Sequence, residues 1–322
     1  ARAMKRAAEA RDDDRVLGTG LARIYVLGVE LGRSDEALAL GALLDPIVAR
    51  TGERPNRRAE LLGYLGSVLW TKGAYAEAAD HLTIALRLRE QTGEVELVAT
   101  LHANLATVLE DQGRHDEALR HSEEAVPIFE RLLGPNHPRT AAMRIDLAGL
   151  LTRQGKHREA QPILESALAA LEAVHGKDSI KIAGAVVSLG DLFNARGDHL
   201  RALPFCQRAV AIAGAKLPPD HPDHADYLLS LATALLGLGR AEEAVAPLEQ
   251  ALSLRRRPAG DPLKVAELEH ALARALWDAG GDRARARSLA EAARDTYAAA
   301  DDHTRSELAA VDAWLASHAR GG

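Results

Sequence analysis

An alanine recurs at a nearly constant interval along most of the chain, always a few residues after a glycine. The spacings between successive alanines are 41, 40, 42, 42, 42 and 42 residues. The alanines are Ala37, Ala78, Ala118, Ala160, Ala202, Ala244 and Ala286, and their partner glycines are Gly32, Gly73, Gly113, Gly155, Gly197, Gly239 and Gly281. A fixed period of this length indicates a tandem array of repeated units, each packed mainly on its neighbours.

Each repeat has the pattern of two helices joined by a tight turn. Leu101, Leu105 and Leu109 precede Gly113 at helical spacing, and a second apolar run follows it. A glycine ends a helix well because it accepts positive φ. The motif QGRHDEA (112–118) is therefore predicted to be a turn and not an active site. Small residues that would let the two helices approach closely follow the central leucine of the first helix: Gly66, Ala106, Ala148, Gly190, Ala232 and Ala273, with Tyr25 in that place in the first repeat.

The repeats LGSVLWTKGAYAEAADHLTIAL (65–86) and LATVLEDQGRHDEALRHSEEAV (105–126) resemble the tetratricopeptide repeat. The 42-residue period and the linkers LGPNHP (133–138) and LPPDHP (217–222) resemble the kinesin-light-chain type. The resemblance implies an all-α fold, a right-handed superhelical solenoid of about seven helix-turn-helix units with a C-terminal capping helix. Arginine-rich repeats and the ending AAVDAWLASH also resemble the C-terminal arrays of bacterial serine/threonine protein kinases.

Three segments are predicted from these patterns. Residues 1–14 form an N-terminal helix like the tail of a preceding repeat, residues 15–300 form seven repeats, and residues 301–322 form the capping helix. Thr304 and Glu307 have the spacing of a capping box at the start of that last helix. Leu308, Val311 and Leu315 then form an apolar stripe that would cover the final repeat.

Composition excludes several classes of function. The net charge of −6 argues against binding nucleic acid, which usually requires a basic patch. Cys206 is the only cysteine, so no intrachain disulfide forms and a reducing compartment is expected. No apolar run approaches the roughly 18 residues that would span a membrane. A cytoplasmic protein is the prediction.

Residues that often carry chemistry have structural explanations here. His115, His157 and His199 take the same turn position in successive repeats, too far apart to share one metal ion. His221 and His224 are one helical turn apart but have no third ligand in the sequence, and Cys206 is predicted to be a buried small apolar residue. Nucleophile, phosphate-binding and dinucleotide-binding motifs are missing. We therefore expect no enzyme activity, no metal and no cofactor.

The resemblance also implies that first helices line a concave groove. Groove candidates at matching positions of the repeats are Arg23, Tyr64, Asn104, Thr107, Asp111, Asp146, Arg153, Ser188, Asp191, Asn194, Ser230 and Arg274. Asn104 matches the asparagine with which many relatives hold a peptide main chain; an amide can both donate and accept. The groove carries more acidic than basic residues, so a neutral or basic peptide is expected. The alternative is that these are merely solvated positions with small side chains.

Four functions remain open from the sequence. The first is a non-catalytic scaffold that binds a peptide or a partner protein. The second is the sensor or docking arm of a larger kinase, whose catalytic motifs would lie outside these 322 residues. The third is a peptide receptor, and the fourth is a structural array that self-associates.

Overall fold

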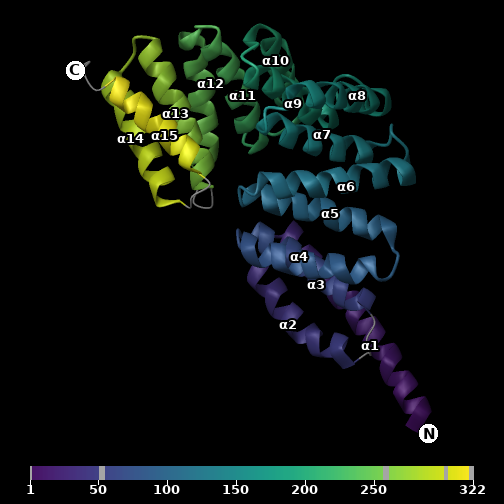
Figure 1. Cartoon of the computed structure of the whole chain (residues 1–322). Coiled ribbons are helices and arrows are strands. Elements are labelled where there is room, and N and C mark those ends of the chain that lie inside the picture. Colours follow the sequence, from purple (N-terminus) through teal and green to yellow (C-terminus); the bar gives the residue numbers. More distant parts are fainter. Residues whose placement is uncertain (1, 51–54, 257–260, 301–303, 319–322) are drawn as a thin grey trace. The chain divides into compact units, whose positions relative to one another are not determined.

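The protein is described here from a computed structural model, which covers residues 2–50, 55–256, 261–300 and 304–318. All regular structure in these residues is helical, so the prediction of an all-α solenoid is confirmed (Figure 1). The chain divides into two compact units, residues 1–135 and residues 136–322, and each is described by itself.

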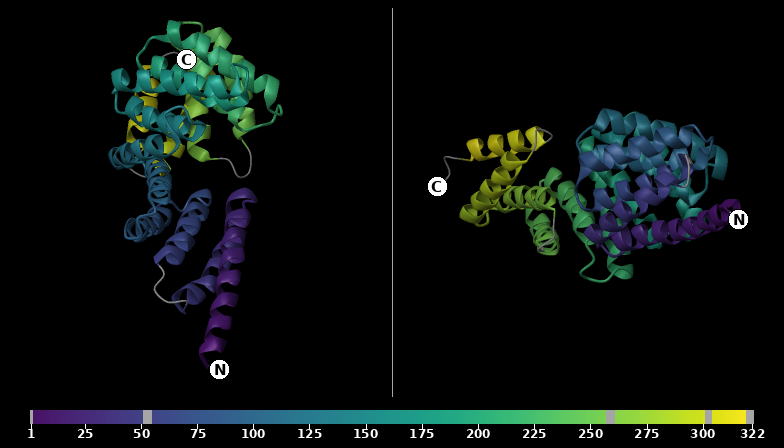
Figure 2. Two further views of the ribbon diagram at one scale, coloured as in Figure 1. Left: turned by 90° about the vertical axis from the view of Figure 1, so that its right-hand side faces the viewer. Right: turned by 90° about the horizontal axis from the view of Figure 1, so that it is seen from below.

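Unit 1 contains the first three repeats. Its elements are α1 (Arg2–Tyr25), the π-helix η1 (Val26–Glu30), α2 (Ser34–Arg50), α3 (Pro55–Thr71), α4 (Tyr75–Glu90), α5 (Val95–Asp111) and α6 (His115–Leu133). The helix α1 runs through residue 14 without a break, so the expected N-terminal helix and the first helix of repeat 1 are one element (Figure 2).

Unit 2 contains the last four repeats and the final helix. Its elements are α7 (Pro138–Arg153), α8 (His157–His175), the 3₁₀ turn η2 (Ile180–Ile182), α9 (Ala183–Ala195), α10 (His199–Lys216), α11 (Asp223–Gly237), α12 (Ala241–Arg255), α13 (Pro262–Asp278), α14 (Arg283–Ala299) and α15 (Arg305–Ser317).

The periodic alanines are the points where paired helices meet. All seven have 0% of their surface exposed. The small residues of the first helices are equally constrained, and they face the residue one turn after the periodic alanine: a Cβ atom on Gly66 would lie 2.7 Å from Leu82 Cγ, and one on Gly190 would lie 2.6 Å from Cys206 Sγ. Both distances are too short for real carbon contacts, so the close packing requires glycine at these positions.

The glycines after the first helices take positive φ in all seven repeats, as predicted, but with one correction. In repeat 7 the residue is Gly280 (φ 70°) and not Gly281. The Gly281 N–H instead donates to Leu276 O at 2.8 Å, just as Arg114 N–H donates to Leu109 O at 2.8 Å in repeat 3. The turn of repeat 7 is one residue longer, and Asp282 after it caps α14 by accepting from Arg285 N–H.

Repeat 1 departs from the pattern where Tyr25 replaces the small residue. The π-helix η1 begins directly after Tyr25. Within η1, Gly28 is the small residue at the close contact between helices, where it faces Val68 and Ala37. The wider π turn therefore accommodates the larger side chain of Tyr25. Its ring packs against that of Tyr64, with 5.9 Å between the ring centroids.

The C-terminal helix α15 packs on α14 (Figure 2), and its predicted apolar stripe contributes to the core. Val311 is fully buried, and Leu308 and Leu315 pack against the apolar core of the last repeats. The predicted capping box is wrong. The Thr304 hydroxyl makes no capping bond and donates to Tyr297 O of α14 at 3.0 Å, because the residue is buried against that helix. Residues 301–303 and 319–322 of the predicted capping segment lie outside the described residues.

The two kinds of glycine predict opposite effects of alanine. Gly155 has φ 72° with no neighbour near its absent Cβ, so Gly155→Ala costs about 1 kcal/mol in backbone strain alone. Gly149 lies inside α7, equally open, so Gly149→Ala stabilises by about 0.8 kcal/mol through helix propensity. Urea unfolding of both variants measures this. Shifts of the same sign would contradict the turn assignment.

Candidate functional site: the inner helices of each unit

The first helices of successive repeats contact one another within each unit. In unit 1, α3 lies against both α1 and α5, and in unit 2 the series α7, α9, α11 and α13 continues in the same way. A second helix such as α4 packs instead between its own first helix and the next one. In a curved stack of repeats, the helices that contact their counterparts in both neighbouring repeats lie on the inner side. Each unit therefore presents its first helices on its concave side.

Unit 1 has a cavity of about 1080 Å³ on this side, lined mainly by α3 and α5 with contributions from α1 and α4. Its volume lies slightly above the roughly 300–1,000 Å³ typical of ligand pockets. Tyr64, Asn104 and Thr107 from the predicted set line it together. This cavity is the best-formed candidate site in the described residues.

Aromatic and aliphatic side chains form much of the cavity wall. The rings of Tyr25 and Tyr64 contact each other, and Leu97 and Leu101 of α5 add aliphatic surface. The Trp70 indole N–H donates to Asp111 Oδ2 at 2.5 Å, which fixes the ring at the end of α3. Asp111 was predicted to contact a ligand directly, and in the structure it orients a cavity residue.

The charged groups of the cavity are paired with each other. Arg57 Nη1 lies 3.0 Å from Glu60 Oε2, and Arg89 Nη1 lies 2.8 Å from Glu94 Oε2. Burial raises the pKa of Tyr64, aided by the negative charge of Glu60, so its phenol stays protonated and able to donate.

The hydroxyl groups of the cavity donate to their own helices. Ser67 donates to Gly63 O at 3.2 Å, Thr100 to Glu96 O at 2.9 Å, and Thr107 to Ala103 O at 3.2 Å. They offer only oxygen lone pairs to a ligand. Asn104 is half-buried, and its side chain makes no hydrogen bond within the part of the chain that the structure describes. It is thus available both to donate and to accept.

Unit 2 has a smaller cavity of about 590 Å³, and most of the side chains that line it belong to polar residues. Arg153, Ser188 and Asp191 from the predicted set lie together there, with Thr152 and His157 beside them. Asp191 keeps a large exposed surface, yet dense protein around it raises the pKa of its carboxyl to about 6. The negative charge of Asp226 adds to the rise, while a hydrogen bond from Ser230 and the positive charge of Arg153 oppose it.

Other predicted residues do not line either cavity. The Asn194 amide nitrogen donates to Ser230 O at 3.0 Å, and its Oδ1 accepts from His199 Nδ1 at 3.1 Å, so both ends of the amide are engaged within these two repeats. Arg23, Asp146 and Arg274 are exposed on α1, α7 and α13. Sequence reasoning missed Tyr25 and Leu97 as cavity residues, although Tyr25 replaces a small residue of the repeat and Leu97 lies where other repeats have Arg57, Arg139 and Lys181.

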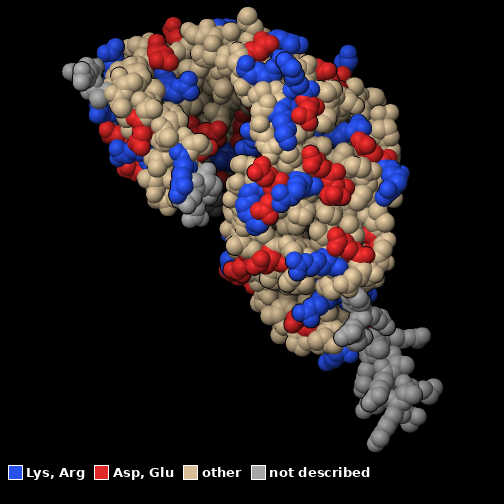
Figure 3. Space-filling model, in the orientation of Figure 1, with Lys and Arg blue, Asp and Glu red and all other residues tan. Residues whose placement is uncertain are grey.

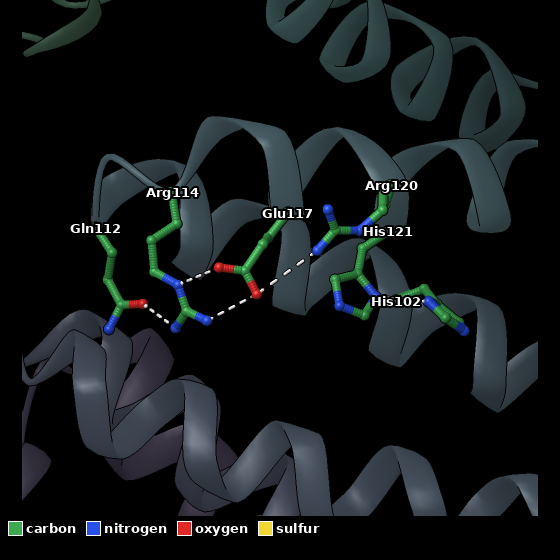
Figure 4. A network of polar contacts seen from close by, with 6 residues as sticks. All are labelled: His102, Gln112, Arg114, Glu117, Arg120 and His121. Carbon is green, nitrogen blue, oxygen red and sulfur yellow. Dashed lines mark hydrogen bonds and ion pairs between the residues drawn. The ribbon is translucent and has the colours of Figure 1, made fainter.

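The motif QGRHDEA is a turn with its charges satisfied internally (Figure 4). Arg114 donates to both carboxylate oxygens of Glu117, at 2.7 and 2.8 Å, and this ion pair lowers the pKa of Glu117. The same pair recurs as Arg240 with Glu243 after Gly239. Positive and negative side chains are accordingly interspersed over the surface shown in Figure 3.

No metal centre is apparent in the described residues. No group of three or more His, Cys, Asp or Glu side chains there is placed to hold an ion. Two potential metal ligands that do lie close together are His102 of α5 and His121 of α6, whose Nδ1 atoms are 2.9 Å apart (Figure 4). Burial lowers the pKa of both rings, so at neutral pH they form a hydrogen bond between uncharged imidazoles.

The remaining candidate side chains are structural. Cys206 is fully buried, as predicted, and burial raises the pKa of its thiol to about 12. His199 packs beneath Gly237 of the next repeat, and the His137 ring accepts from Arg139 N–H at the start of α7. Among the described helices none combines the length and apolar character that crossing a bilayer requires.

Family models confirm the repeat. One tetratricopeptide repeat model matches residues 96–173 and 181–257, and a second matches residues 65–121. The chain belongs to the tetratricopeptide repeat family. No curated protein gives a significant sequence match.

Solved structures agree with this assignment. A structure of nearly identical kinesin-light-chain TPR-like repeats from Podosopora anserina is 26% identical, with a TM-score of 0.50, covering 64% of this chain and 97% of that one. NprR in complex with its cognate peptide NprX has a TM-score of 0.68 at 12% identity, covering 95% and 85%. A Rap protein complexed with Competence and Sporulation Factor has a TM-score of 0.61 at 14% identity, covering 95% and 99%.

The tie between Trp70 and Asp111 predicts a spectroscopic change. In Asp111→Ala the indole loses its acceptor and becomes free to leave the cavity wall. We expect a red-shifted emission of Trp70, stronger acrylamide quenching and a loss of about 0.5–1 kcal/mol in stability. Trp277→Phe and Trp314→Phe in the background leave Trp70 as the only emitter. Unchanged emission and quenching would show that Asp111 does not position the ring.

The raised pKa of Asp191 predicts that this residue destabilises unit 2. Because its folded pKa (about 6) exceeds the unfolded value of 3.8, the folded state loses stability as pH rises through this window. Asp191→Asn should therefore gain about 1 kcal/mol at pH 7.5, after discount for solvent exposure, and nothing at pH 3.5. Urea unfolding at both pH values measures the gain.

Glu243→Gln is the matched control for this prediction. The ion pair with Arg240 lowers the pKa of the Glu243 carboxyl, so neutralising this side chain should give no gain in stability at pH 7.5. An equal gain in both variants would mean that the benefit comes from net charge and not from the surroundings of Asp191.

Proposed function

We propose that this chain is a non-catalytic scaffold that binds an extended peptide segment of a partner on the inner helices of unit 1. The observation that carries the proposal is the cavity of about 1080 Å³ lined by α3 and α5, with the unpaired amide of Asn104 in its wall. A concave, mostly apolar site with a few convergent polar groups is the usual form of a ligand site.

Asn104 suits recognition of peptide main chain. Its side chain can donate to a carbonyl and accept from an N–H of the same extended segment, irrespective of the side chains on it. The nearby hydroxyls of Ser67, Thr100 and Thr107 present acceptors, since their own protons are already donated to helix carbonyls. A peptide could therefore satisfy donors on this wall without displacing any internal bond.

The similar structures support the proposal at the level of fold. NprR holds its cognate peptide NprX, and the Rap protein holds Competence and Sporulation Factor. Both cover nearly the whole of this chain, so a peptide ligand is compatible with this architecture. The alternative of a kinase docking arm stays a prediction.

The residues that the site offers support a non-catalytic role. The unit 1 cavity contains no histidine or cysteine, and its carboxylates at Glu60 and Glu94 are engaged by arginines. Cys206, the only thiol in the chain, is buried and protonated. The cavity thus has hydrogen-bonding groups and apolar surface, the means of binding.

The role of Asn104 is testable with a phage-displayed library of random dodecapeptides. Peptides selected on the full chain should bind Asn104→Ala about 10–100-fold more weakly, because two hydrogen bonds to the peptide main chain are lost. Asn136→Ala, at an exposed linker asparagine, is the matched control and should bind normally. Fluorescence anisotropy of labelled peptides measures both. Selection of no peptide, or equal binding to both variants, would overturn the proposed function.

A further inference from the structure

Two histidines form a polar contact between the paired helices of repeat 3. His102 Nδ1 of α5 lies 2.9 Å from His121 Nδ1 of α6, and the two ring centroids are 5.1 Å apart (Figure 4). In repeat 5 the matching positions hold Val186, which is fully buried, and Phe205, which packs against the apolar core. The fold of the repeat therefore does not require imidazoles at these two positions.

The hydrogen bond between the rings restricts how many protons they can carry. One Nδ1 must hold a hydrogen and donate, and the other must present a lone pair and accept. One additional proton is compatible with the bond, since an imidazolium then donates to the neutral ring. When both rings are charged, no acceptor remains and two positive charges face each other at this distance.

The surroundings make the doubly charged pair unfavourable in the folded protein. Burial is the largest cause of the lowered pKa of both rings, and the charge of His102 lowers the pKa of His121 further. Burial outweighs the opposing negative charges among the side chains of α4 and α6 that act on the pair, which are Glu90, Glu117, Arg120 and Glu124.

The sign of the pH dependence follows from these shifts. Both folded pKa values lie below the 6.5 of an unperturbed imidazole. The contribution of the pair to stability is therefore present above pH 6.5 and is lost as the pH falls through the folded pKa values. Both rings are half-buried, so protons reach them from solvent.

The pair joins a wall of the unit 1 cavity to the helix behind it. Its first member lies on α5 between Leu101 and Asn104, which both line the cavity. Its second member lies on α6, which packs along α5. Loss of the hydrogen bond therefore removes a contact that holds this wall in place.

We propose that His102 and His121 form an acid-sensitive contact, which holds α5 against α6 at neutral pH and releases it when both imidazoles are protonated. This device goes beyond the proposed peptide-binding function and does not depend on it, because it concerns the packing of repeat 3 without a ligand.

Hydrogen–deuterium exchange of the full chain without peptide tests the proposal, with EDTA present so that no metal ion bridges the rings. Rates at pH 7.5 and pH 4.5 are corrected for the intrinsic pH dependence of amide exchange. The acceleration of α5 and α6 in acid should be at least about 10-fold greater in wild type than in His121→Asn, since one pKa unit corresponds to a factor of ten.

The variant His121→Asn keeps a hydrogen bond that acid does not break. An amide oxygen accepts from an imidazole N–H whether or not that ring is charged. The chain already contains such a pair in repeat 5, where Asn194 Oδ1 accepts from His199 Nδ1 at 3.1 Å. The double variant His102→Val/His121→Phe, which copies the residues of repeat 5, should lose the acceleration in the same way.

His81→Asn is the matched control. His81 occupies in repeat 2 the position that His121 occupies in repeat 3, and its Nδ1 lies 2.8 Å from Glu77 O of its own helix. This variant should keep the full acceleration of α5 and α6. No excess acceleration in wild type over the two His121 variants, or its loss in His81→Asn as well, would overturn the proposal.

Discussion

The close approach of the two helices in every repeat is the constraint on which the rest of the structure depends. It involves the periodic alanine, which is fully buried in all seven repeats, and a small residue of the first helix, such as Gly66 against Leu82 and Gly190 against Cys206. The positive-φ glycine one turn earlier reverses the chain tightly enough to bring the helices together. Where repeat 1 has Tyr25 in the small position, the backbone widens into a π turn and Gly28 restores the contact.

This packing also determines where ligands have access. Because first helices contact one another within each unit, their outward residues share a continuous inner face. The two units use that face differently. Unit 1 leaves aromatic and aliphatic side chains uncovered around paired charges, whereas in unit 2 the surrounding protein, with a smaller contribution from the charge of Asp226, raises the pKa of Asp191. Surface that is unfavourable in the free protein is typical of a binding site, since function and stability compete there.

The fold was largely predictable from the sequence, because its determinants are local and periodic. Spacing alone identified the buried alanines and six of the seven turn glycines. The exception, Gly280, arises from one inserted residue, and spacing could not say on which side of the turn it lies. Thr304 was misassigned because a hydroxyl can serve a helix terminus or a neighbouring helix equally well, and burial against α14 decides between them.

The candidate site was less predictable, since it depends on contacts between repeats. Position within the repeat predicted that Tyr64, Asn104 and Thr107 share the inner face, and all three line the unit 1 cavity; their contact with a ligand stays a prediction. It could not show that Asn194 would bond to Ser230 O of the next repeat, or that Asp111 would bond to Trp70. Those bonds join residues 36 and 41 positions apart, and no local pattern distinguishes them from free side chains.

The central claim is that the inner helices of unit 1 bind peptide. Hydrogen–deuterium exchange by mass spectrometry, with and without a library-selected peptide, tests it most directly, because it reports on each helix separately. The account predicts slower exchange in α3 and α5, with the outer helix α6 unchanged. Protection confined to α6, or to unit 2 alone, would contradict it.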